Sequence, residues 1–180
     1  MQEQDIQKII ICELERLGLQ QEAVFCASLG SVGLAAYKVA VQNFLYANDF
    51  NNALKWLDYA ILSRPDYYQA FYRKGEIYRL QGLYDKAIID YTTGLKFVGG
   101  PDAINGLCWG LVERGYCFLK VGRYDEALGD FTRAMQNKTD TYFGDKEFGG
   151  LESLMKQAST GGTNKLIGDT NIAFNNKPIY

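Results

Sequence analysis

Residues 82–92, GLYDKAIIDYT, recur 40 residues later as residues 122–132, GRYDEALGDFT. A looser copy precedes them by 34 residues, at residues 48–58, NDFNNALKWLD. Repetition at a period of about 20–50 residues is typical of proteins built from stacked supersecondary units. The copies therefore predict a solenoid of helix pairs. The long surface of such a stack suits the binding of another chain better than it suits catalysis.

Glycine recurs where the copies need the backbone to turn. Gly82 and Gly122 lie where one helix must end and the chain reverse, which favours a left-handed conformation. Asn48 holds the same position in the first copy, and asparagine tolerates that conformation better than most residues. We therefore expect a left-handed residue in all three turns.

A second pair of glycines lies inside predicted helices. Gly75 and Gly115 each cost about 1 kcal/mol relative to alanine there, so a gain in packing should offset the cost. We expect that gain to be a close approach of the second helix of each pair. The small residues on that second helix would be Ala53, Ala87 and Ala127.

The copies resemble the tetratricopeptide repeat, a helix–turn–helix unit of about 34 residues. The first copy reads Y-x2-AV-x2-F from residue 37, A-x3-L from residue 53 and then Pro65. The second reads F-x2-KG-x2-Y from residue 71 and A-x3-Y from residue 87, and the third L-x2-RG-x2-F from residue 111 and A-x3-F from residue 127. The resemblance covers roughly residues 34–139, and it is weakest at Val41, where glycine is usual. It implies an all-α, right-handed α–α superhelix of antiparallel helix pairs.

We expect one helical domain over residues 1–158, followed by an extended or disordered tail over residues 159–180. The tail contains apolar residues and could instead dock in the groove of the solenoid. The expected parts of the domain are an N-terminal capping hairpin at residues 5–33, repeats at 34–67, 68–105 and 106–140, and a C-terminal capping helix at 146–158. The second repeat includes six extra residues at 99–104, which we expect to form a longer loop because Gly-Gly-Pro breaks helices.

Composition argues against catalysis and against a cofactor. The 180 residues contain no histidine, which removes the commonest general base and the commonest metal ligand. The four cysteines form no C-x2-C pair, so a zinc site is not supported. The recurring carboxylates are expected to be solvated, because they follow the repeat; they are Asp85 with Asp90 and Asp125 with Asp130.

Charge and cysteine usage bear on partners and location. The net charge of −2 gives no reason to expect nucleic acid or a membrane surface as partner, and no apolar run is long enough to span a membrane. The acidic, polar N-terminus is unlike a secretory signal. We expect buried thiols in a reducing compartment, the cytoplasm, at Cys12, Cys26, Cys108 and Cys117.

The resemblance implies that the first helix of each pair lines a concave groove, which places a peptide-binding surface on helices 34–47, 68–81 and 108–121. The inward-facing residues would be Lys38, Gln42, Tyr46, Gln69, Tyr72, Arg73, Glu76, Arg79, Trp109, Val112, Glu113 and Tyr116. Aromatic residues and arginine are enriched in binding hot spots, so the best candidates are Tyr72, Arg73, Trp109 and Tyr116. The alternative, that any one of them packs on a neighbouring helix, stays open.

One subclass of the family grips the carboxylate of a chaperone tail with lysine, asparagine and arginine side chains from three repeats. Lys38 matches that set, whereas its other members are replaced by Gln42, Arg73, Trp109 and Glu113. The loss of cations and the gain of a carboxylate oppose the capture of an anionic carboxylate. A peptide with apolar anchors and mixed charge is the better expectation.

Two functions follow from the sequence. The first is a non-enzymatic interaction module, a scaffold that binds a peptide segment of a partner and acts as an adaptor or assembly chaperone. The alternative is a structural subunit that self-associates through its end helices or its C-terminal tail.

Overall fold

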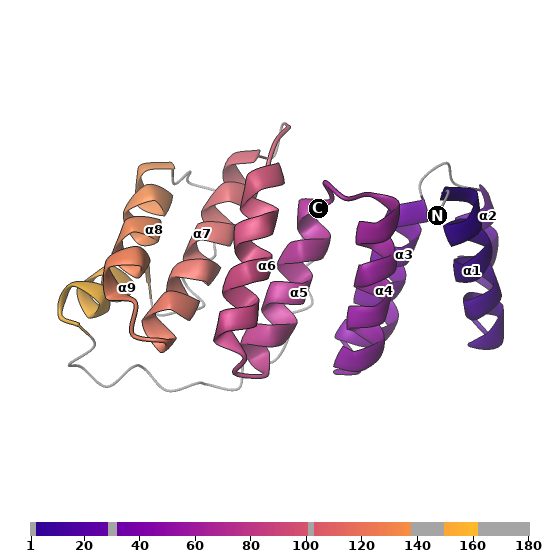
Figure 1. Ribbon diagram of the computed structural model, residues 1–180, viewed down its shortest axis with the longest axis horizontal. Helices are drawn as coiled ribbons and strands as arrows, with labels where there is room; N and C mark the ends of the chain where they lie inside the picture. Colours follow the sequence, from indigo (N-terminus) through magenta and orange to yellow (C-terminus); the bar gives the residue numbers. More distant parts are fainter. Residues whose placement is uncertain (1–2, 29–31, 101–102, 138–149, 162–180) are drawn as a thin grey trace. The chain divides into compact units, whose positions relative to one another are not determined.

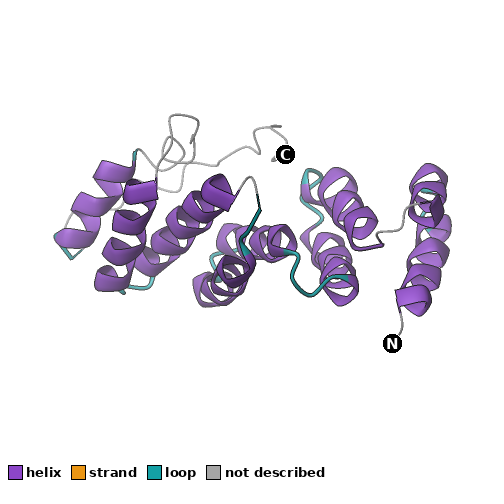
Figure 2. Cartoon of the chain, turned by 90° about the horizontal axis from the view of Figure 1, so that it is seen from above, coloured by secondary structure: helices purple, strands orange, loops and turns teal. Residues whose placement is uncertain are grey.

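The computed structural model describes residues 3–28, 32–100, 103–137 and 150–161, and all regular secondary structure in these residues is helical (Figures 1 and 2). The chain divides into two compact units, Met1–Ile77 and Tyr78–Tyr180. The boundary falls inside helix α5, Tyr68–Leu80. Consecutive helices pack as pairs, so the predicted all-α solenoid of helix pairs is confirmed.

The first unit holds the N-terminal hairpin and the first repeat. Its helices are α1 (Glu3–Arg16), α2 (Gln20–Ser28), α3 (Val32–Val39), the π-helical segment η1 (Ala40–Leu45) and α4 (Phe50–Ser63), followed by the first part of α5. Helix α1 packs on α2, and α3 with η1 packs on α4. The core of this unit is apolar and includes Ile6, Ile10, Leu14, Leu45, Trp56 and Leu57. Asp49 caps α4 by accepting a hydrogen bond from the Asn52 backbone N–H at 3.2 Å.

The second unit holds the last turn of α5 and four further helices. They are α6 (Tyr84–Phe97), α7 (Ala103–Lys120), α8 (Tyr124–Asn137) and α9 (Leu151–Ser159). Helix α7 packs between α6 and α8, and α9 packs on α8. The largest buried side chains include Tyr91, Leu111, Leu119, Phe131, Leu151 and Leu154.

The turns inside the three repeats adopt the predicted left-handed conformation. The φ angles are 59° at Asn48, 73° at Gly82 and 77° at Gly122. An L side chain is strained there unless it is small and polar, which explains why glycine and asparagine occupy the position. The turn therefore has the same backbone geometry in each copy.

The six residues inserted between the second and third copies do not form the long loop that was expected. Helix α7 begins at Ala103 and has 18 residues, whereas α5 has 13, so most of the insertion lengthens the first helix of the third repeat. The connection from the end of α6 at Phe97 is correspondingly short. Gly-Gly-Pro marks where a helix stops, but it does not prevent the next one from starting directly afterwards.

Gly115 lies where α7 and α8 approach most closely. A Cβ atom built on it would lie 2.5 Å from Cε1 and 2.9 Å from Cδ1 of the Phe131 ring. The predicted close approach is therefore confirmed, but the side chain that needs the space is Phe131 and not the small Ala127. Packing of a buried aromatic ring offsets the cost of glycine in the helix.

The first repeat solves the same packing problem differently. Val41 stands where Gly115 stands in the third repeat, and Leu57 stands where Phe131 does. The backbone around Val41 is π-helical, and the Tyr46 backbone N–H bonds to the Val41 carbonyl at 3.4 Å. A larger residue on the first helix is thus accompanied by a smaller one on the second and by a wider helical turn.

The structure bears on the expectations for the C-terminal helix and for the cysteines. Within the described residues the C-terminal helix is α9, Leu151–Ser159, which follows Gly150 with φ of 96°. Residues 146–149 and the predicted tail from residue 162 lie outside the described residues. Cys12 is exposed, whereas Cys26, Cys108 and Cys117 are buried as expected, and these four cysteines form no disulfide in the described parts of the chain.

Replacing Gly115 by alanine should lower the free energy of unfolding by about 1–3 kcal/mol, because the new methyl group overlaps the Phe131 ring. Chemical denaturation measures this change. The matched control is Gly129→Ala on α8, where a Cβ meets nothing within 4 Å. That substitution should stabilise the protein by up to about 1 kcal/mol. Equal effects of the two substitutions would contradict the packing assignment.

The cysteines should differ sharply in reactivity. Burial raises the pKa of the Cys26, Cys108 and Cys117 thiols, and the carboxylate of Glu113 raises that of Cys117 further. The thiolate is the reactive form, so these three should resist alkylation of the native protein at pH 8, while the exposed Cys12 should react. Peptide mass spectrometry after a timed reaction with iodoacetamide checks this, and rapid labelling of Cys117 would contradict it.

Candidate protein-binding surface

The structure separates the twelve predicted groove residues into exposed, half-buried and buried groups. Lys38 and Gln42 are exposed, and the half-buried residues are Tyr46, Gln69, Glu76, Trp109 and Tyr116. The other five are buried, namely Tyr72, Arg73, Arg79, Val112 and Glu113. The expectation that all twelve present their side chains to a groove is therefore wrong for these five. These five residues instead follow the alternative, in which a predicted groove residue packs on a neighbouring helix.

Arg73, one of the predicted hot spots, is held by neighbours in the first unit. Its Nη1 lies 2.7 Å from Oε2 of Glu76, and its Nε donates to the Tyr37 hydroxyl at 3.4 Å. Burial lowers the pKa of Arg73, but Glu76 and Tyr37 outweigh that effect and raise it, so the guanidinium stays charged. Two of the predicted groove charges thus neutralise each other.

A second internal charge pair joins predicted residues in the second unit. Nε of Arg79 lies 2.7 Å from Oε2 of Glu113, and both side chains are almost fully buried. The Tyr91 hydroxyl donates to the same carboxylate oxygen at 3.1 Å. A buried carboxylate needs such partners, because an unpaired charge in the interior is strongly destabilising. Glu113 therefore organises the interface between α6 and α7 and does not face a ligand.

Trp109 and Tyr116 are the predicted aromatic residues of the second unit that keep part of their surface in solvent. They lie seven residues apart on α7, and therefore about two helical turns apart on one side of the helix. The Trp109 ring packs edge-on against the buried Tyr91, with 5.8 Å between centroids. The Tyr116 ring has the Arg79 guanidinium at 6.0 Å and the Lys120 ammonium at 5.2 Å from its centroid. Both rings are thus fixed by specific neighbours.

Lys120 and Tyr37 contribute to these surroundings and were missed by sequence reasoning. Lys120 follows Tyr116 by four residues on the same helix, a spacing that brings side chains together and could have revealed it. Tyr37 carries no comparable signal, because its contact with Arg73 joins residues that are 36 apart in the chain. Contacts of that kind depend on how helices pack.

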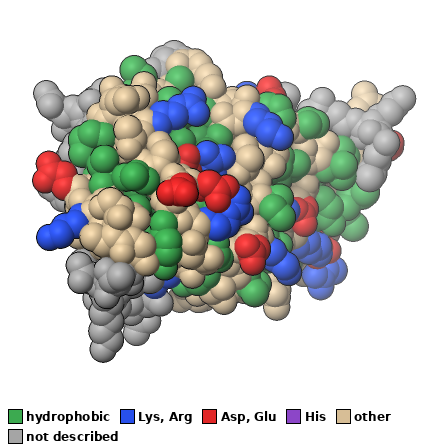
Figure 3. Space-filling view, turned by 60° about the vertical axis from the view of Figure 1, so that its left-hand side comes forward, with side chains coloured by type: hydrophobic (Ala, Val, Ile, Leu, Met, Phe, Trp, Pro, Cys, Tyr) green, Lys and Arg blue, Asp and Glu red, His purple; other side chains and the backbone are tan. Residues whose placement is uncertain are grey.

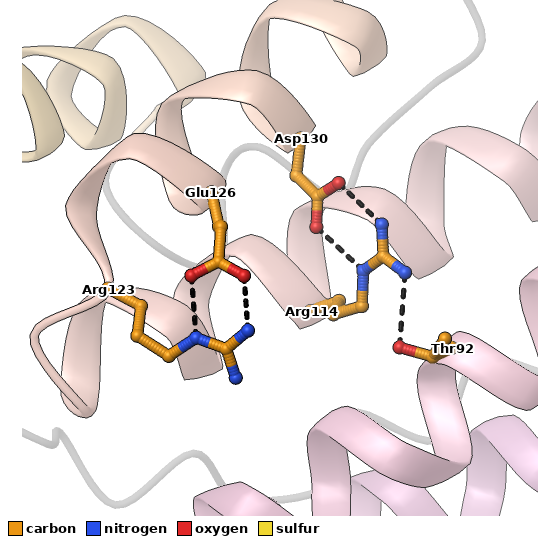
Figure 4. Close-up of polar contacts among 5 residues, drawn as sticks. All are labelled: Thr92, Arg114, Arg123, Glu126 and Asp130. Atoms are coloured by element: carbon orange, nitrogen blue, oxygen red, sulfur yellow. Dashed lines mark hydrogen bonds and ion pairs between the residues drawn. The ribbon is translucent and has the colours of Figure 1, made fainter.

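A third polar cluster connects three helices of the second unit (Figure 4). Arg114 on α7 forms two hydrogen bonds to the Asp130 carboxylate on α8, at 2.8 and 2.7 Å. Its Nη1 donates to the Thr92 hydroxyl on α6 at 3.1 Å. Asp130 is buried, so the expectation that it is solvated is wrong. Bidentate geometry of this kind fixes the orientation of both side chains.

The Arg114 cluster has a sequence signal that was not used. Lys74 and Arg114 occupy the same position in their copies, directly before the glycine, and Asp58 occupies the position of Thr92 in the quoted stretches. In the first unit Lys74 pairs with Asp58 at 2.6 Å. The recurring cation thus contacts the same position of the preceding helix in both copies, which is Asp58 in one and Thr92 in the other.

Parts of both units match a known family. The family model of the tetratricopeptide repeat matches residues 26–97. This segment of the chain is similar to the tetratricopeptide repeat family. A search of curated proteins found no match. Tetratricopeptide repeats generally mediate protein–protein interactions. The third repeat of this chain lies beyond the matched segment, but it contains the Gly122 turn and the Gly115–Phe131 contact.

Two further features to consider in the described residues are groups of metal ligands and membrane-spanning helices. Among residues 3–28, 32–100, 103–137 and 150–161, no three histidine, cysteine, aspartate or glutamate side chains are grouped as metal ligands. No helix in those ranges has the length and apolar character needed to span a bilayer. On the face of the protein shown in Figure 3, acidic and basic side chains are interspersed with hydrophobic ones and are not separated by sign. The chemistry of this face is therefore mixed.

Removing Asp130 should destabilise the third tetratricopeptide repeat. Asp130→Ala leaves the Arg114 guanidinium without its bidentate partner, and we expect the free energy of unfolding to fall by about 2–4 kcal/mol. The matched control is Glu126→Gln, which breaks the exposed bidentate pair with Arg123 shown in Figure 4. Exposed pairs contribute little, so the control should leave the denaturation midpoint nearly unchanged. A small effect of Asp130→Ala would show that the cluster is not structurally important.

Proposed function

We propose that this protein is a non-enzymatic interaction module that binds a peptide segment of a partner protein along the first helices of its tetratricopeptide repeats. It would serve as an adaptor or assembly chaperone in a reducing compartment, the cytoplasm. The family supports protein binding in general, and the geometry of α7 supports the specific site.

The observation that carries this proposal is the pair of half-buried aromatic rings on α7. Trp109 and Tyr116 are immobilised by Tyr91, Arg79 and Lys120, so little side-chain entropy would be lost when a partner covers their remaining surface. Rigid aromatic residues with one covered and one open side are typical of binding hot spots. In the first unit, the proposed contacts are the predicted residues that are not buried, namely Lys38, Gln42, Tyr46, Gln69 and Glu76.

Internal pairing of charges defines the partner that would fit. Arg73 is neutralised by Glu76, and Arg79 by Glu113, so Lys38 is the one cation of the predicted set outside these two pairs, which is little positive charge to hold an anionic tail. The proposed ligand is therefore a segment with one or two aliphatic or aromatic anchors. Where there are two, their separation should match the distance between Trp109 and Tyr116, about two turns of α7. Its charged residues would be of both signs.

A double substitution tests the α7 site. Selection from a random peptide display library on the wild-type protein should enrich peptides with apolar anchors. Their affinity should fall at least about 30-fold for Trp109→Ala with Tyr116→Ala, as expected for the loss of about 2 kcal/mol of hot-spot energy. Isothermal titration calorimetry with the selected synthetic peptides measures the change, and circular dichroism checks that the helices remain.

The matched control is Phe97→Ala on α6, which removes an aromatic side chain that is 42% exposed but lies outside the proposed surface. It should leave peptide affinity unchanged. If the α7 double variant binds as tightly as wild type, the site lies elsewhere. If no peptide is enriched at all, the protein is not a peptide-binding module.

A further inference from the structure

Helix α1 carries a second, outward-facing stripe in addition to the one that joins it to the core. The inner stripe, Ile6, Ile10 and Leu14, is buried. A second set with alternating spacings of four and three residues is exposed along its whole length; it consists of Asp5, Ile9, Cys12 and Arg16. Such spacing places all four side chains on one face of an α-helix and is the spacing of a helix–helix contact.

The outer stripe has an apolar centre and opposite charges at its two ends. Ile9 is 43% exposed, although the other apolar residues at helical spacing in α1 are buried. Cys12 is the exposed thiol of the chain and lies directly beside Ile9 on this face. Asp5 precedes this apolar centre and Arg16 follows it. An isolated apolar centre with polar ends resembles half of a small interface.

We propose that this stripe binds the same stripe of a second copy of the chain, with the two α1 helices antiparallel about a two-fold axis. Reversal of direction places Asp5 opposite Arg16 of the second copy. The midpoint between Asp5 and Arg16 in the sequence is also the midpoint between Ile9 and Cys12, so the same register places Ile9 opposite Cys12 of the second copy. One register therefore matches both the charges and the apolar residues, as an isologous contact requires.

The residues beside the stripe have the same complementarity. Lys8 and Glu15 are exposed on one flank of the stripe, two turns apart. In an antiparallel pair, side chains on the same flank of the two helices face each other near the axis, which brings Lys8 toward Glu15 of the second copy. A parallel arrangement would instead bring Asp5 against Asp5 and Arg16 against Arg16 of the second copy, and such like-charge contacts are destabilising.

The structure holds α1 and Arg16 ready for such a contact. Lys55 on α4 lies 2.5 Å from Oε1 of Glu13, which anchors α1 to the first repeat. The same carboxylate accepts hydrogen bonds from Nε and Nη2 of Arg16 at 2.9 and 2.8 Å. The guanidinium has five N–H donors in total, so a second carboxylate can bind beside Glu13. The Arg16 side chain is 66% exposed and thus accessible to it.

Charge reversal in the full-length chain tests the pairing. Wild-type protein should show a monomer–dimer equilibrium by sedimentation between about 1 μM and about 1 mM, and Asp5→Arg alone or Arg16→Asp alone should weaken it at least about tenfold. An equimolar mixture of the two variants should recover dimer, because the reversed charges then face opposite charges in the heterodimer. The control Asp125→Arg, an exposed residue on α8, should leave the dimer unchanged.

A disulfide fixes the register. With Ile9→Cys, mild oxidation should cross-link two copies through position 9 of one and Cys12 of the other, and Cys12→Ser should abolish the product. The control Val24→Cys, at a residue 69% exposed on α2, should cross-link less. Wild-type protein that stays monomeric throughout would overturn the proposal. So would a dimer that is insensitive to both charge reversals, a mixture that fails to associate, or equal cross-linking of the control.

Discussion

The contact between the backbone at Gly115 and the ring of Phe131 is the constraint on which the second unit depends. Helix α7 can lie between α6 and α8 only because no side chain separates its backbone from that ring. The close approach brings Arg114, the residue before Gly115, within reach of both Thr92 and Asp130. It also sets the level at which Glu113 meets Arg79 and Tyr91. A steric condition at one residue thus determines where the polar clusters form.

These polar clusters decide which residues remain available to a partner. Charged side chains on the first helices are largely satisfied by one another or by the second helices, which removes them from the surface. The predicted groove residues on α7 that keep exposed surface, Trp109 and Tyr116, are both aromatic. They contact Tyr91 and Arg79, which also bind the buried Glu113. The arrangement keeps the rings in place before any ligand arrives, which is the usual physical basis of preorganised binding.

The sequence predicted those features that depend on local backbone requirements. A left-handed turn accepts few residues, so Asn48, Gly82 and Gly122 could be recognised directly. The periodicity of the copies was sufficient to predict helix pairs. The burial of Tyr72, Val112 and Glu113 could not be predicted in this way, because it depends on the side chains that neighbouring helices place against them. The insertion was misassigned for a related reason, since a breaker such as Gly-Gly-Pro says nothing about where the next helix begins.

The π-helical segment Ala40–Leu45 changes how the repeats can be compared with one another. A π turn contains about one residue more than an α turn, so the side chains after it are rotated by about a quarter turn or more relative to an uninterrupted helix. Val41, Gly75 and Gly115 still occupy corresponding positions in the sequences of the three repeats. After Leu45, however, residues at corresponding sequence positions no longer point their side chains in corresponding directions. The first repeat therefore presents different side chains to a ligand from those that its alignment with the other two repeats suggests. Tyr46 directly follows the π-helical segment, so the rotation alters its orientation most directly.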